Sequence, residues 1–261
     1  EGNRHHRHLR SRRFDGGYRQ RYSRGDEVVR TAYCVLLIGE QMPKLTIQIL
    51  KREAHKFSQM ESSHKEKSLF GVTDGKAVGT YLEHKFRNYL RTKYSFQIGS
   101  SASGIDFPEL QVDMKVTSIA QPQSSCPFKS ARQKIYGLGY SLLIFVYEKT
   151  DNTKSKTTTL NILHTIFVDA DRTADYQMTI GLTDIMAHSG NKHDLKAFMF
   201  DKNLPILDED EADKLADQVM SNPPKIGYLT ISNALQWRLQ YSRVIEHAGL
   251  GNGISLVYRA K

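Results

Sequence analysis

The sequence predicts an α/β fold in which a mixed β-sheet is flanked by helices. Residues 140–147 form a near-continuous apolar run, which is typical of a central strand buried on both faces. Residues 112–116 alternate apolar and polar side chains, the period of a strand with one face in a core. Apolar residues at helical spacing occur on both sides of these strands, at 77–91 and 207–220. This order of elements indicates helices packed on a sheet.

The elements expected before the alternating strand are a helix, a loop, a second helix, a short strand and a Ser/Gly-rich loop. In chain order they span 45–60, 59–68, 77–91, 94–98 and 99–104. The second helix has Thr73 or Asp74 as a natural N-cap, because a side-chain oxygen there can accept a hydrogen bond from a free backbone N–H. Residues 104–117 then read as a hairpin, with Asp106 on its first strand just ahead of a Pro-Glu turn.

The elements expected after the hairpin are listed here in chain order: an extended loop at 118–128, a helix at 129–138, the buried strand at 140–147, a polar turn at 151–158, a strand at 160–168, short mixed segments at 173–182 and 194–200, an acidic helix at 207–220, a helix at 230–247 and a strand at 254–258. Pro223 and Pro224 end the acidic helix, since proline cannot donate a helical hydrogen bond. Gly249 ends the next one.

Composition limits the class of protein. The chain has 261 residues, a formal net charge of +9 and a pI near 9.4, which favours a polyanionic partner such as nucleic acid. Its two cysteines, Cys34 and Cys126, form no CxxC spacing, which fits a reducing cytoplasm. The apolar runs are too short to cross a bilayer. No P-loop motif occurs, so a nucleotide cofactor is not expected.

The first 41 residues differ in composition from the rest. They contain nine arginines and no lysine, whereas residues 42–261 contain 20 lysines and 8 arginines. Three interpretations remain open: a disordered basic tail that adds non-specific DNA affinity, a folded extension, or sequence upstream of a natural start at Met42, which we favour slightly. We expect residues 42–261 to form a single domain.

The hairpin carries the chemistry. Asp113 and Lys115 share one face of its second strand, and Asp106 reaches them from the first. Two carboxylates, with the Met114 backbone carbonyl as a further ligand, can hold Mg²⁺, which prefers a few oxygen ligands plus water and phosphate. Lys115 can orient a metal-activated hydroxide and stabilise charge on a phosphate. The plain alternative is a surface Asp–Lys ion pair on a strand.

This segment resembles the PD-(D/E)XK nuclease motif, with Asp106 and Asp113 as its acids and Lys115 as its lysine. The chain also resembles a type II restriction endonuclease in size and layout, with residues 73–168 as the catalytic core. The resemblance implies a restriction-endonuclease-like mixed sheet, Mg²⁺-dependent cleavage of double-stranded DNA, and a homodimer. It also implies that Glu83 is an additional acid near the metal; the alternative is a solvent-facing helix carboxylate. Glu109 is the substitute if Asp106 points away.

Several other segments are candidates for DNA contact. Lys129, Arg132 and Lys134 follow the motif on a short helix and fit phosphate contacts, and Gln133 is similar to a glutamine beside the active site of related nucleases. The amides of the loop 121–125 can read adenine edges. In the C-terminal region, about 169–261, which we expect to serve recognition and dimerisation, one helix carries Gln236, Trp237, Arg238, Gln240 and Arg243. It is either a DNA-reading helix or a helix with Trp237 in the core.

The leading hypothesis is therefore a type II restriction endonuclease. A repair or structure-specific nuclease of the same fold is the first alternative, because the fold alone does not separate the two. A non-catalytic DNA-binding protein, in which Asp113 and Lys115 merely form an ion pair, is the second.

Overall fold

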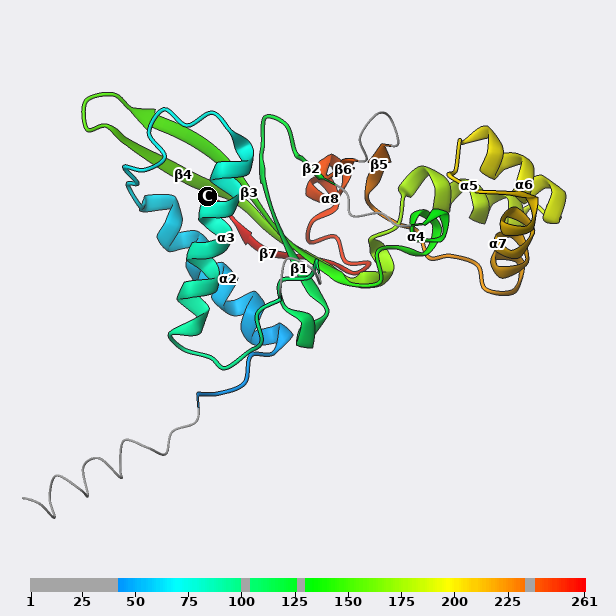
Figure 1. The fold of residues 1–261 in the computed structure, drawn as a ribbon, viewed down its shortest axis with the longest axis horizontal. Coiled ribbons are helices and arrows are strands. Elements are labelled where there is room, and N and C mark those ends of the chain that lie inside the picture. The colour runs from blue at the N-terminus through cyan, green and yellow to red at the C-terminus, as the bar shows by residue number, and fades with distance from the viewer. Residues whose placement is uncertain (1–41, 100–103, 126–129, 233–237) are drawn as a thin grey trace, which may run out of the picture. The chain divides into compact units, whose positions relative to one another are not determined.

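The computed structural model describes residues 42–99, 104–125, 130–232 and 238–261, which belong to one compact unit, Met42–Lys261 (Figure 1). Its strands are β1 (Val112–Ser118), β2 (Gln123–Ser125), β3 (Ser141–Asn152), β4 (Thr157–Val168), β5 (Thr230–Ser232), β6 (Arg238–Gln240) and β7 (Ile254–Arg259). Its helices are α2 (Ile47–Ser63), α3 (Gly75–Arg91), α4 (Ala131–Tyr136), α5 (Tyr176–Ala187), α6 (Lys192–Asp201), α7 (Glu209–Ser221) and α8 (Ser242–His247), with short 3-10 turns η1 (Pro108–Leu110) and η2 (Ala170–Arg172). The three interpretations of residues 1–41 lie outside the described residues.

The main sheet has the strand order β1-β3-β4-β7. β1 and β3 are parallel, whereas β3–β4 and β4–β7 are antiparallel, so the sheet is mixed, as predicted. Leu142–Val146 are fully buried at the centre of β3. The apolar run therefore does form a strand covered on both faces.

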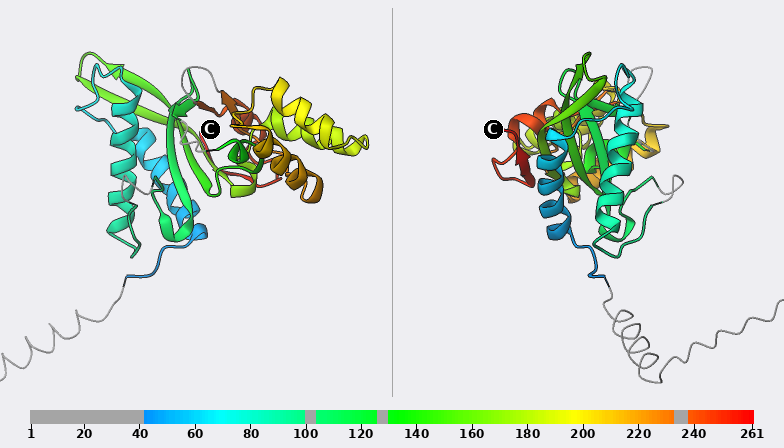
Figure 2. Two further views of the ribbon diagram at one scale, coloured as in Figure 1. Left: turned by 45° about the vertical axis from the view of Figure 1, so that its right-hand side comes forward. Right: turned by 90° about the vertical axis from the view of Figure 1, so that its left-hand side faces the viewer.

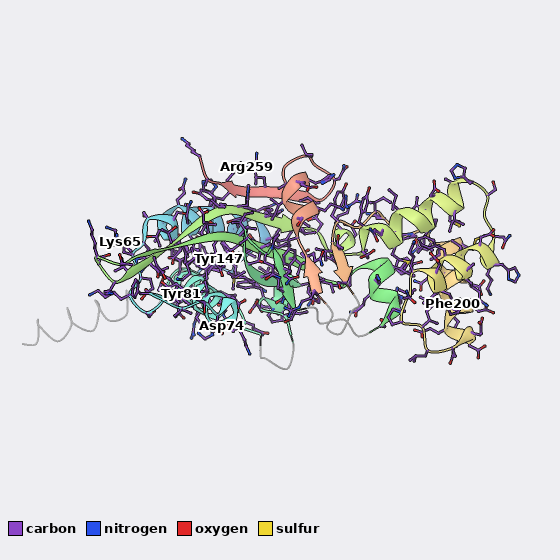
Figure 3. The ribbon with its side chains drawn as sticks, turned by 90° about the horizontal axis from the view of Figure 1, so that it is seen from above. Lys65, Asp74, Tyr81, Tyr147, Phe200 and Arg259 are labelled. Carbon is purple, nitrogen blue, oxygen red and sulfur yellow. The ribbon has the colours of Figure 1, made fainter. Side chains whose placement is uncertain are left out.

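Helices α2 and α3 pack against one face of this sheet (Figure 2). The Thr46 side chain accepts a hydrogen bond from the Ile49 N–H at the start of α2, and the Asp74 carboxylate accepts from the Lys76 N–H at the start of α3. Asp74 and Tyr81 lie near Tyr147 of β3 when the molecule is seen from above (Figure 3). Both helices were predicted, and Asp74 is confirmed as the N-cap of the second.

The opposite face of the sheet packs on a second, three-stranded sheet of order β2-β6-β5 and on α8. The helix predicted at 230–247 is wrong, since this segment contains β5, β6 and α8. Ile231 and Leu239 are inward-facing residues of two paired strands, and their helical spacing is incidental. Gln236 and Trp237 lie outside the described residues, while Arg238 and Arg243 lie on a strand and a helix respectively.

Helices α4 to α7 form a third cluster with its own apolar core. α7 begins at Glu209, directly after its N-cap Asp208, so the acidic helix predicted at 207–220 is confirmed. α5 and α6 replace the two mixed segments of the sequence analysis. α5 escaped detection because apolar residues lie around most of its circumference, from the buried Met178 and Leu182 to the exposed Ile180.

Three local predictions also need correction. Residues 94–98 form no strand; Ser95 makes one isolated bridge with Lys44. The extended loop 118–128 contains β2. The segment before the alternating strand is not a second hairpin strand, because it consists of η1 and a single bridge between Phe107 and Val112. Within the part of the chain that the structure describes, no helix is long and apolar enough to cross a membrane.

Candidate active site

The edge strand β1 sorts its side chains between two faces. Val112 and Met114 are buried in the core beneath α2 and α3. Asp113 and Lys115 alternate with them and therefore lie on the other face, opposite Leu142 and Ile144 in the strand register. The strand thus holds a carboxylate and an ammonium group beside each other, as the sequence predicts.

Asp106 reaches this strand through a tight turn. η1 ends at Gln111, whose φ of 51° is left-handed, and the chain then doubles back so that Phe107 and Val112 exchange backbone hydrogen bonds. Asp106 Oδ2 consequently accepts a hydrogen bond of 2.9 Å from the Met114 N–H. The short interval between the two acids is therefore compatible with a shared site, although it is spanned by a turn and not by a strand.

The Asp113 carboxylate is almost fully buried, at 4% exposure. Lys115 Nζ lies 2.7 Å from Asp113 Oδ2, so the buried carboxylate is paired with an ammonium group. Burial raises the pKa of Asp113 to about 6; Lys115 opposes this rise, and Asp106 adds to it. Because its pKa is still raised beside Lys115, the carboxylate is a candidate to bind a further cation.

Glu83 on α3 belongs to the same group of charges. Burial raises its pKa to about 7, with a further contribution from the negative charge of Asp106; Lys115 and Arg87 act in the opposite direction. Glu83 is therefore not the solvent-facing helix carboxylate of the alternative interpretation.

Arg87 was not found in the sequence analysis. It lies one helical turn after Glu83, and its Nη1 donates a hydrogen bond of 3.3 Å to Asp106 Oδ1. The i, i+4 spacing from Glu83 is the sequence signal that could have indicated it, because such residues lie on one face of a helix.

This group fits a divalent metal ion. Three carboxylates face two cations, so with every group ionised there is one excess negative charge. Asp106, Asp113 and the Met114 carbonyl are the candidate ligands; that carbonyl leaves the strand on the same side as the Met114 N–H, toward Asp106. Elsewhere in the described ranges, as here, no three His, Cys, Asp or Glu side chains already converge as a metal cluster. A site with two carboxylates completed by water and phosphate is what Mg²⁺ commonly uses.

The other predicted site residues are placed differently. Glu109 forms an ion pair of 3.9 Å with Lys44. On α4, Arg132 is exposed and donates to Gln218, Gln133 is half-buried, and Lys134 is buried beside Asp175, with a pKa lowered by burial. Lys129 lies outside the described residues. The structure therefore places Glu83, Asp106, Asp113 and Lys115 close together beside β1; their roles, like those of the α4 residues, stay predictions.

Comparison with known proteins is consistent with this geometry. The sequence profile of a family described as "Type II restriction enzyme NspV" matches residues 44–256. A curated relative, the type II restriction enzyme NspV of Nostoc sp. (strain ATCC 29411 / PCC 7524), is 67% identical over 218 residues, which cover 84% of this chain and 99% of the relative. No solved structure matches the chain. A match of this extent places the chain plainly: it belongs to the NspV family of type II restriction enzymes.

Proposed function

We propose that this protein is a Mg²⁺-dependent restriction endonuclease that hydrolyses phosphodiester bonds at a specific sequence in double-stranded DNA and acts as a homodimer in the cytoplasm. The observation that carries the proposal is the union of Asp106, Asp113 and Lys115 around β1, with Glu83 beside them. Family membership supports a DNA substrate and a divalent metal cofactor.

Each residue has a role that follows from its position. Asp106 and Asp113 would hold the metal, and the Met114 carbonyl adds a third oxygen. A bound Mg²⁺ supplies a water of lowered pKa and neutralises charge at the scissile phosphate. Lys115, anchored beside Asp113, orients the attacking oxygen and stabilises the phosphate as its charge increases.

Glu83 and Arg87 complete the arrangement. With a pKa of about 7, Glu83 can accept a proton near neutral pH. Arg87 keeps one Asp106 oxygen in place while the Met114 N–H holds the other. The Asp106 carboxylate is therefore oriented before a metal arrives, which reduces the entropy lost on binding.

Asp113→Ala is expected to reduce cleavage of phage DNA by roughly 100- to 1,000-fold or more, since it removes a metal ligand. DNA binding should persist, because phosphate contacts supply most of the affinity. The variant should stay folded, since Lys115, which loses its partner, is 20% exposed and its ammonium group can reach solvent. The measurement is a digest with Mg²⁺, with gel-shift binding in parallel.

Asp184→Ala is the matched control, because this aspartate is exposed on α5 and, among the described residues, pairs with the exposed His188. It should cut like the wild type. Undiminished cleavage by Asp113→Ala would refute the site, and smeared products from the wild type would contradict sequence-specific cleavage.

A further inference from the structure

The three short strands of the second sheet align their side chains in rows. In register across β2, β6 and β5, the rows are Gln123–Gln240–Thr230, Ser124–Leu239–Ile231 and Ser125–Arg238–Ser232. Figure 1 shows the three strands beside one another, next to α8. The register therefore defines two faces of very different chemistry.

The middle row forms the inner face. Leu239 and Ile231 are buried in the core that joins this sheet to β3, and Ser124 bonds the hydroxyl of the buried Tyr241. Side chains alternate along a strand, so the other two rows must project from the opposite face. Every residue in those rows is polar, and each is half-buried or exposed.

We propose that this outer face, defined as Gln123, Gln240, Thr230, Ser125, Arg238 and Ser232, reads base edges of the target duplex. Gln123, Gln240 and Arg238 are its main specificity-determining residues. The inference rests on the proposed function and adds to it the surface that chooses the sequence.

The side-chain chemistry of the outer face matches a DNA groove. Glutamine pairs with adenine through two hydrogen bonds, arginine pairs with guanine in the same way, and serine and threonine contact either base. The face has one cation and no carboxylate, so it does not repel phosphates. It also lacks the apolar centre that a protein partner would require. Two neighbouring strands of this sheet form a ribbon of the kind that enters the major groove, about 12 Å wide.

The outer face is tied to the catalytic strand. β1 ends at Ser118 and β2 begins at Gln123, with only four residues between them. Thr117, on the same face of β1 as Asp113 and Lys115, directs its hydroxyl to the carbonyls of Gln121 and Gln123, each 3.2 Å away. The Tyr241 N–H donates to the Pro122 carbonyl, which fixes the same connection to β6. A surface held in this way can place a recognised base at a defined distance from the cut.

Polar character continues past β5. A cavity of about 430 Å³ is bordered by Thr230 and Ser232 together with Gln177, Asn203, the exposed cation Lys202 and the buried Lys134, and also by the apolar Met178 and Ile231. Asp175 is the acid in its lining, and both carboxylate oxygens already accept backbone hydrogen bonds, from Met178 and Ile231. DNA on the outer face would thus find the Gln177 and Asn203 amides and the exposed cation Lys202 beside it.

The test begins by mapping the sequence that the full chain cuts in phage DNA. Synthetic duplexes then carry that sequence and each single-base-pair change. Gln123→Ala, Gln240→Ala and Arg238→Ala are compared with Gln59→Ala and Arg91→Ala, which remove the same side chains from exposed positions on α2 and α3. The same substitutions in an Asp113→Ala background report binding without cleavage.

Each outer-face variant should lose roughly 5- to 150-fold in kcat/KM on the mapped sequence, with relaxed discrimination at one base pair. In the Asp113→Ala background, its affinity should fall toward that for unrelated DNA. Wild-type discrimination in all three variants would overturn the inference, as would an equal loss in the α2 and α3 controls. If the wild-type chain leaves phage DNA uncut or gives smeared products, the proposed function fails instead, so the two failures are distinguishable.

Discussion

At the scale of single residues, the decisive feature is the crowding of acids at the edge of β1. Asp113 is buried close to Asp106, and both conditions raise its pKa, while Lys115 compensates only in part. The pKa of Glu83 is raised further, to about 7. Keeping these carboxylates together therefore lowers the free energy of unfolding of the metal-free protein, and binding of a divalent cation would raise it again.

The first consequence is a pH dependence of stability in EDTA. Glu83 has an ordinary pKa of 4.5 when unfolded and about 7 when folded, so the folded protein binds more protons between these values. Its contribution to the free energy of unfolding falls as pH rises from 4.5 to 7. Glu83→Gln has no titrating group at this position, so it does not lose this stability. The difference between its Tm and that of the wild type should increase from pH 4.5 to pH 7 and stay constant above pH 7.

Glu148→Gln, at an exposed position on β3, should show no such trend. A margin between Glu83→Gln and the wild type that is the same at pH 5 and pH 8 would contradict the assignment.

The residues of the site differ in how far the sequence could predict them. Asp113 and Lys115 share a strand face because of period two, which needs only local information. Arg87 and Asp106 are 19 positions apart, and their hydrogen bond depends on how α3 packs against β1. The burial that moves Lys134 from a predicted phosphate contact to a place beside Asp175 is likewise a tertiary effect.

At the scale of elements, one close approach joins the helical cluster to the second sheet. Gly227 precedes β5, and a Cβ built there would lie 2.1 Å from the Ala174 carbonyl oxygen. That contact is with backbone, so a side-chain rotation cannot relieve it. The segments leading into α5 and β5 can thus run side by side, and they do so in a parallel bridge between Asp175 and Leu229.

Gly227→Ala is therefore expected to lower the free energy of unfolding by roughly 1–3 kcal/mol, as for overpacked interiors. Gly75→Ala is the control: it lies in the first turn of α3, with open space around it, and alanine favours helix. Urea unfolding of both variants measures the difference. A Gly227→Ala protein as stable as the wild type would show that the two segments separate easily.

The sequence predicted long elements better than short ones. α2, α3, α7 and the buried strand β3 follow from periodicity over many residues. β5 and β6 have three residues each, too few to show alternation, and the spacing of Ile231 and Leu239 imitates a helix. β2 is stabilised by pairing with β6, more than 100 positions away, and local patterns carry no trace of that partner.

At the scale of the whole molecule, the chain combines a net charge of +9 with one group of catalytic candidates among the residues that the structure describes. The charge supplies attraction to any DNA, so specificity has to come from base contacts. In the proposed homodimer one active site cuts each strand, because two-fold symmetry places the second copy on the opposite strand.

Mixing wild-type protein with Asp113→Asn tests that arrangement. Mixed dimers hold one working site, so supercoiled plasmid should accumulate as nicked circles, and sedimentation should show a particle of twice 29.8 kDa. Heat-inactivated Asp113→Asn is the control, and it should leave linear product dominant. A mixture that gives only linear product would argue against one site per strand.

The four-residue passage from β1 to β2 has a consequence for redesign. Thr117 and the Tyr241 N–H hold this connecting segment at both ends. Its length would therefore set the distance between the phosphodiester bond that is cut and the bases that the outer face contacts. Substitutions on the outer face would then change which base pairs are recognised, and the offset between the cleavage positions on the two strands would stay the same. Lengthening or shortening the connecting segment would move the cleavage position while the recognition sequence stays the same.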